Sequence, residues 1–152
     1  MLINTIINNN KTTIEIKPGE YLVDTLRKLG KYSVRRGCDT SCCGLCSVLM
    51  DGKPVLSCSM LSIRAEGRHI TTIEGLQEEV NEFASFLTKE GADQCGFCSP
   101  GFIISVIAMQ KELKNPSEED IKHYLAGNLC RCTGYVGQLR AIKKYLESKE
   151  VN

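Results

Sequence analysis

Four cysteines in the first half of the chain constrain its fold more than any other feature. Cys38, Cys43, Cys46 and Cys58 follow the pattern C-x4-C-x2-C, with one more cysteine after eleven further residues. Three thiols of one loop reach a single small centre only if the backbone between them curls around it. The fourth thiol arrives from the end of the following segment and closes the site, so the pattern indicates a metal centre.

This spacing is that of plant-type ferredoxins, whose four thiolates hold a two-iron two-sulfur (2Fe-2S) cluster. Zinc is the alternative, but zinc sites favour two separated C-x2-C pairs, and the loop lacks the first of them. Gly37 and Gly44 suit a loop whose backbone approaches a cluster without side-chain obstruction. The first set of cysteines therefore predicts a 2Fe-2S cluster.

A second set of four ligands consists of the pairs Cys95/Cys98 and Cys130/Cys132. Each pair is expected just before a helix, where free N–H groups and the positive end of the helix dipole favour a negatively charged cluster. The C-x2-C pair also fits zinc, whereas C-x-C is a poor match to the common zinc pairings. We therefore expect a second 2Fe-2S cluster, with a four-cysteine zinc site as the alternative.

Composition and charge narrow the classes of function. Nine cysteines in 152 residues are too few for a disulfide-stapled miniprotein and many for a cytosolic chain. No signal-peptide pattern opens the chain, and no apolar run approaches the ~20 residues of a membrane span, so we expect a cytoplasmic protein without a membrane partner. A formal charge of +1 lacks the basic footprint of nucleic-acid binding. No nucleotide-binding or catalytic-triad pattern occurs, so no catalytic residue is predicted.

The first half reads as a small α+β unit. Leucines at helical spacing from Leu22 to Leu29 predict one helix, ended by Gly30. The Asp51-Gly52 turn returns the chain toward Cys58 and the other ligands. The expected strands cover residues 2–8, 12–17, 47–50, 54–56 and 69–73. The expected core is Ile14, Ile16, Leu22, Leu26 and Leu29.

The second half has a helical period. The expected helices run from Leu76 to Gly91, from Ser99 to about Leu113, from Ser117 to Gly127 and from Thr133 onward. Ser99 and Thr133 are predicted N-caps, and Ser117 opens a capping-box pattern. The change of period predicts two domains, a plant-type 2Fe-2S ferredoxin-like domain at 1–76 and a helical 2Fe-2S-binding domain at 77–152.

Both motifs, in this order, resemble one family, the iron–sulfur subunits of molybdenum hydroxylases. That family includes xanthine dehydrogenase, aldehyde oxidoreductase and molybdenum carbon monoxide dehydrogenase, and the resemblance spans nearly the whole chain. The matching motifs are Cys38-x4-Cys43-Gly-Leu-Cys46-x11-Cys58 and Gln94-Cys95-Gly-Phe-Cys98-x31-Cys130-Arg-Cys132-Thr-Gly-Tyr135.

The resemblance implies a β-grasp ferredoxin-like domain followed by a four-helix domain, each with one 2Fe-2S cluster. It implies that the helical-domain cluster faces the molybdopterin of a large subunit, with Gln94 beside the pterin and Cys132 as the nearest ligand. The plant-type cluster would face an FAD, often on a medium subunit. The chain would then be the electron-transfer subunit of a heteromeric oxidoreductase, with no substrate site of its own.

Three features depart from the family pattern. The loop from Asp39 to Cys42 stands where many members have a glycine-rich loop. Cys42 is an additional cysteine, and its use as a ligand would break the x4 gap, so we expect a free thiol that faces away from the cluster. Gln138 stands at a position that is commonly aliphatic and is expected to alter packing near the last helix.

Two other functions remain as alternatives to electron relay from molybdenum to flavin. A stand-alone ferredoxin would diffuse between enzymes, but such a carrier usually has a charged docking face, and the net charge is near zero. A zinc-stabilised structural module would be colourless, whereas 2Fe-2S proteins are red-brown. Colour therefore separates the zinc alternative from the other two.

Overall fold

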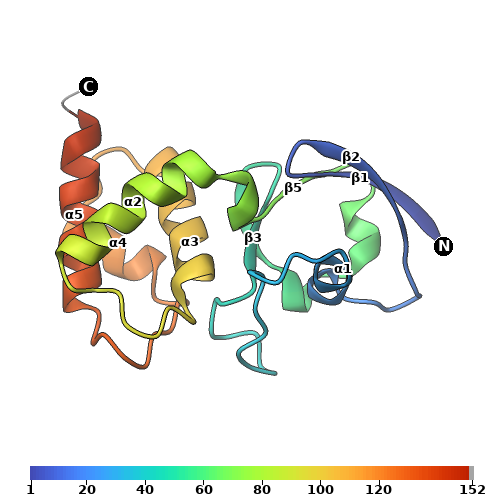
Figure 1. Ribbon diagram of the computed structural model, residues 1–152, viewed down its shortest axis with the longest axis horizontal. Helices are drawn as coiled ribbons and strands as arrows, with labels where there is room; N and C mark the ends of the chain where they lie inside the picture. Colours follow the sequence, from blue (N-terminus) through green and yellow to red (C-terminus); the bar gives the residue numbers. More distant parts are fainter. Residues whose placement is uncertain (151–152) are drawn as a thin grey trace.

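The computed structural model describes residues 1–150, and its two halves lie side by side with the chain termini at opposite ends (Figure 1). A mixed five-stranded sheet and one α-helix form the N-terminal half, and four α-helices form the C-terminal half. This is the α+β architecture that the sequence predicts. The division into domains 1–76 and 77–152 stays a prediction, and residues 151–152 of the second lie outside the described residues.

The sheet has the strand order β2-β1-β5-β3-β4. The hairpins β1–β2 and β3–β4 are antiparallel, and β5 lies between them, parallel to β1 and antiparallel to β3. Ile3 and Ile7 alternate with more exposed residues along β1 and pack in one core with Leu22 and Leu26 of helix α1 (Leu22–Lys28). The strands are β1 Leu2–Ile7, β2 Asn10–Glu15, β3 Ser47–Met50, β4 Lys53–Leu56 and β5 His69–Thr71.

Two local expectations are wrong in this half. The first hairpin turns at Asn8 and Asn9, one residue before the turn at 9–11 that the expected strands 2–8 and 12–17 imply, because φ is positive at both (48° and 67°). That pair of angles belongs to a two-residue hairpin turn of the primed type, which asparagine tolerates. Leu29 is exposed and lies outside the core, because α1 ends at Lys28 and Leu29 is its C-cap.

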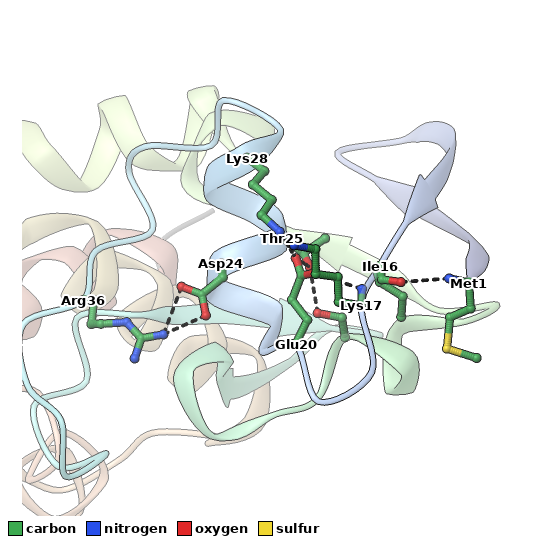
Figure 2. Close-up of polar contacts among 9 residues, drawn as sticks. Met1, Ile16, Lys17, Glu20, Asp24, Thr25, Lys28 and Arg36 are labelled. Atoms are coloured by element: carbon green, nitrogen blue, oxygen red, sulfur yellow. Dashed lines mark hydrogen bonds and ion pairs between the residues drawn. The ribbon is translucent and has the colours of Figure 1, made fainter.

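The segment that enters the first cysteine loop is tied to α1 (Figure 2). Arg36, which lies two residues before Cys38, donates two hydrogen bonds of 3.0 Å to the Asp24 carboxylate. Near the start of the same helix, the Glu20 carboxylate accepts hydrogen bonds from Lys28 at 2.7 Å and from Thr25 at 2.8 Å. Charge-assisted bonds of this kind hold the helix and the start of the loop in one arrangement.

The second half is built around one buried helix. The helices are α2 Gln77–Lys89, α3 Ser99–Glu112, α4 Glu118–Tyr124 and α5 Val136–Glu150. Every residue of α3 from Gly101 to Met109 is buried, as its apolar sequence predicts. One face of α3 packs against β3, where Leu49 contacts Ile104 and Ala108. α3 therefore joins the two halves (Figure 1).

Two helix starts differ from expectation. The N-cap of α3 is Cys98, so Ser99 occupies the first helical position. α5 begins at Val136 and not directly after Thr133, because Tyr135 has a φ of 68°, which is outside the helical region.

The other local expectations in this half hold with small changes. The capping box of α4 is present between Ser117 and Asp120. That helix ends at Tyr124, ahead of the expected end at Gly127. Within residues 1–150, no helix combines the length and apolar character needed to cross a bilayer.

Candidate metal centres

The first four cysteines form two pairs, and one of these pairs spans the β3–β4 hairpin. Cys46 directly precedes β3, and Cys58 follows β4, so the hairpin returns the fourth cysteine to the third. The sulfurs of Cys46 and Cys58 are hydrogen-bonded to each other, and so are those of Cys38 and Cys43. The set therefore consists of two sulfur pairs.

Hydrogen bonds and burial change the acidity of these thiols. The Cys43 thiol and three backbone N–H groups of the loop donate to the Cys38 sulfur and lower its pKa to about 6. Burial raises the pKa of Cys46 to about 11. Two sulfurs that converge on one proton also converge on the position of one iron, and N–H groups aimed at sulfur stabilise the thiolate form. The residues present therefore fit a thiolate-bound cluster.

The second set pairs one cysteine from each of its two motifs. The sulfurs of Cys95 and Cys132 are 3.5 Å apart, and Cys98 and Cys130 are hydrogen-bonded through their sulfurs. Burial, reinforced by Cys130, raises the pKa of Cys98 to about 12. Among the described residues, no three His, Cys, Asp or Glu side chains converge as they would on a single ion. Sulfurs gathered in pairs suit a two-iron core, in which each iron takes two thiolates.

The turn after the second set is closed by side chains that contact Cys130. Thr133 donates to the Cys130 sulfur at 3.2 Å and accepts from the Tyr135 N–H at 3.3 Å. The Tyr135 hydroxyl in turn accepts from the Cys130 N–H at 2.9 Å. Thr133, expected as a helix cap, therefore supports a cysteine instead. The Tyr135 contact was not predicted, although the Cys-Thr-Gly-Tyr run marks the place.

The loops that carry the two sets touch each other directly. The Leu129 N–H donates to the Cys43 carbonyl at 2.9 Å, and the Asn128 side chain donates to the Gly44 carbonyl at 3.4 Å. A Cβ on Gly44 would collide with the carbonyl oxygen of Gly127. Gly44 is therefore needed for the close approach of the helical half. Backbone contacts between distant segments leave no pattern in the sequence, so neither Asn128 nor Leu129 was predicted.

Three other residues singled out from the sequence have distinct positions. Cys42 is exposed, and its sulfur lies 3.0 Å from the Thr40 hydroxyl. Gln94 is exposed directly before Cys95. Gln138 is buried. The assignment of the eight cysteines as ligands, the free-thiol role of Cys42 and the pterin contact of Gln94 remain predictions.

Two family models together cover most of the chain. Residues 5–71 match the 2Fe-2S iron-sulfur cluster binding domain, and residues 72–143 match a second 2Fe-2S binding domain. Both models describe 2Fe-2S proteins, which removes the support for a zinc-stabilised module.

Similar proteins extend the same match over nearly the whole chain. The chain is 42% identical over 137 residues to a probable xanthine dehydrogenase component of Bacillus subtilis, covering 89% of this chain and 79% of that one. It is 36% identical over 148 residues to the nicotinate dehydrogenase small FeS subunit of Eubacterium barkeri, covering 95% and 94%. A chain of quinoline 2-oxidoreductase from Pseudomonas putida has a TM-score of 0.91 at 34% identity, covering 100% and 97%. The chain therefore belongs to the iron–sulfur subunits of the molybdenum hydroxylases, the family of xanthine dehydrogenase and aldehyde oxidoreductase, and is an electron-transfer subunit with two 2Fe-2S domains.

Proposed function

We propose that this chain relays electrons from a large molybdopterin subunit to a medium FAD subunit within a cytoplasmic complex. The helical-domain cluster faces the molybdopterin, and the plant-type cluster faces the flavin. The ligands of the plant-type cluster are Cys38, Cys43, Cys46 and Cys58. The ligands of the helical-domain cluster are Cys95, Cys98, Cys130 and Cys132.

The hydrogen bond from the Leu129 N–H to the Cys43 carbonyl carries this proposal. Leu129 directly precedes Cys130, so one bond of 2.9 Å connects a ligand of the first set to the neighbour of a ligand of the second. A bound 2Fe-2S cluster supplies one-electron redox chemistry. The chain itself connects the loops that carry the two cysteine sets and excludes water from Cys43 and Cys46, which are buried. A relay needs both of these properties.

The surroundings of the second set support a partner on that side. Phe97 lies between Cys95 and Cys98, and it is exposed. Leu129 and Tyr135, which flank and contact Cys130, are exposed as well. Apolar side chains gathered on an exposed surface are typical of interaction sites. In the proposed complex they contact the large subunit, and Gln94 contacts its pterin.

Purification from the native source tests the proposal. The chain is expected to elute in gel filtration with two larger chains, one carrying molybdopterin and one carrying FAD. About four irons and four acid-labile sulfides are expected per copy of this chain, with two distinct paramagnetic signals after reduction. Elution of the chain from fresh extract as a lone monomer would favour a freely diffusing ferredoxin instead.

A further inference from the structure

One arginine of the first half reaches the second cysteine set. Arg35 lies three residues before Cys38, in the segment that enters the first cysteine loop. Its guanidinium donates a hydrogen bond of 2.7 Å to the carbonyl oxygen of Gly96, which lies between Cys95 and Cys98. This contact therefore joins the entry of the first loop directly to the first turn of the second set.

The peptide group between Gly96 and Phe97 is bound at both of its ends. Its carbonyl oxygen accepts from Arg35, and its N–H, which belongs to Phe97, donates to the Cys95 sulfur at 3.5 Å. The carbonyl also accepts from the Ser99 N–H at 3.3 Å, but that bond is longer and its donor carries no charge. Charge-assisted hydrogen bonds are shorter than neutral ones and about twice as strong. Arg35 is therefore the main partner that fixes the direction of this N–H.

The guanidinium of Arg35 has a second contact in the same turn. It lies over the ring of Phe97, with 5.0 Å between the guanidinium carbon and the ring centroid, and a cation is attracted to such a ring face. Among the described residues, no carboxylate forms an ion pair with Arg35, whereas the neighbouring Arg36 is paired with Asp24. The positive charge of Arg35 is therefore not neutralised by an acidic side chain, and it acts on the second set.

We propose that Arg35 is a positioning residue of the electron relay, which directs the Phe97 N–H at the Cys95 sulfur and thereby raises the reduction potential of the helical-domain cluster. The inference rests on the proposed role of Cys95 as a ligand of that cluster. An N–H donor to sulfur and a nearby positive charge both favour the more negative, reduced form of a cluster. Connected hydrogen bonds polarise one another, so the charged donor at the carbonyl strengthens the N–H bond at the other end of the peptide group. The first half therefore helps to set the potential of the centre in the second.

Redox titration of the full-length, iron-loaded chain, followed by the paramagnetic signal of each cluster, tests the proposal. Arg35→Met removes the charge and the donor and keeps a long side chain. The helical-domain cluster is expected to become harder to reduce, so that its equilibrium share of electrons relative to the first cluster falls by about tenfold. Arg35→Lys keeps the charge and a donor and is expected to retain most of the unmodified potential. Both signals present, with an unchanged potential in Arg35→Met, overturn the proposal.

Two further variants exclude a purely structural role. Arg36→Met is the matched control, because this arginine is adjacent and binds Asp24 within its own half. It is expected to leave the potential of the helical-domain cluster unchanged, and a shift equal to that of Arg35→Met overturns the proposal. Arg35→Gln, a milder change that removes the charge and keeps an amide donor, is expected to shift the potential in the same direction by less. A lower free energy of unfolding in the Arg35 variants, without any shift in potential, also overturns the proposal.

Failure of the proposed function gives a different result. If Cys95 is not a ligand, Cys95→Ala keeps both paramagnetic signals, and the ligand assignment falls together with the inference about Arg35. If Cys95→Ala loses the second signal while Arg35→Met leaves the potential of that signal unchanged, only the inference about Arg35 falls.

Discussion

The two cysteine sets differ in what encloses them. In the first, Cys43 and Cys46 are 8% and 3% exposed, and the loop lies against the helical half. In the second, Cys95 and Cys132 are exposed on turns beside the ends of helices. Burial and hydrogen bonds to sulfur help to set the reduction potential and the stability of a cluster. The chain therefore buries two cysteines of the first set and none of the second, whose side at Cys95 and Cys132 is open to solvent.

The difference has a structural cause. The first loop is framed by a hairpin and is anchored where Arg36 binds Asp24, and it buries Cys43 and Cys46. The second set joins two turns that are far apart in sequence and sit at the surface of the helical half. A partner subunit that covers this surface would supply the missing enclosure. The two sets are thus expected to respond differently to the same kind of change.

The largest expected effect separates Cys43 of the first set from the adjacent Cys42, which lies outside the set. Cys43→Ser removes a buried thiol that is paired with Cys38, so the iron content is expected to fall from about four to about two per chain. Cys42→Ser alters an exposed thiol and is expected to leave both clusters in place. Iron analysis and the paramagnetic spectra of the reduced variants measure the outcome. Loss of iron in the Cys42 variant, with none in the Cys43 variant, would mean that Cys42 is the ligand and Cys43 the free thiol.

Disruption of the contact between the two halves is expected to have the next largest effect, a decrease in the free energy of unfolding. Gly44→Ala places a methyl group against the carbonyl oxygen of Gly127, at a residue whose φ is 73°. Gly52→Ala is the matched control, because its φ is 82° and open space surrounds it. Both variants bear the strain of a positive φ, and only the first bears the collision, so Gly44→Ala is expected to lower the free energy of unfolding by about 1–3 kcal/mol beyond the control. Denaturant unfolding measures both, and equal losses would show that the loops do not need this close approach.

Spacing along the chain predicted the two cysteine sets, and the structure places their sulfurs in pairs, while their role as ligands remains a prediction. The sequence also predicted the buried α3 and the α+β architecture from the hydrophobic period. It did not predict the bond from Leu129 to Cys43, because a backbone donor has no residue type to recognise. Thr133 was assigned by residue type as a cap, but the positive φ at Tyr135 delays the helix.

Gln138 shows a related limit of what the sequence predicts. The resemblance implied that Gln138 departs from the family pattern, yet such a departure does not say what the side chain contacts. Only the packed fold shows that the amide oxygen is buried without a hydrogen-bond partner among the described residues. A sequence pattern therefore locates an unusual residue, and the fold decides what that residue contacts.

Gln94→Ala, made in the native complex, tests the proposed contact between the exposed side of the second set and the large subunit. If Gln94 donates to or accepts from the pterin of the large subunit, its loss leaves a buried partner group unpaired, at a cost of about 1–3 kcal/mol. Electron transfer from molybdenum is then expected to slow, while the spectrum of the plant-type cluster stays the same. Gln77→Ala, at an exposed glutamine of α2, is the control. A rate that is unchanged by Gln94→Ala would remove the assigned contact.

The smallest expected effect concerns acid, which is predicted to weaken the contacts of Glu20 in the N-terminal half. The Lys28 ammonium, followed by the Lys17 N–H and the Thr25 hydroxyl, lowers the pKa of Glu20 from 4.5 to about 2, and the side chain is only 7% exposed. Because the folded-state pKa is the lower one, this stabilisation is complete well above pH 4.5 and is lost as the pH falls from there toward 2.

Glu20→Gln is therefore expected to lower the free energy of unfolding at pH 7 by about 1 kcal/mol. The difference from the unmodified chain is expected to shrink below pH 4.5, where the wild-type carboxylate begins to take up its proton. Glu118→Gln is the matched change in the helical half, and a smaller effect is expected there because that carboxylate is 43% exposed and its ion pairs face solvent. Denaturant unfolding of the iron-loaded chain between pH 7 and pH 4 measures both. A loss from Glu118→Gln that equals or exceeds the loss from Glu20→Gln would contradict the prediction that Glu20 makes the more acid-sensitive contacts of the two.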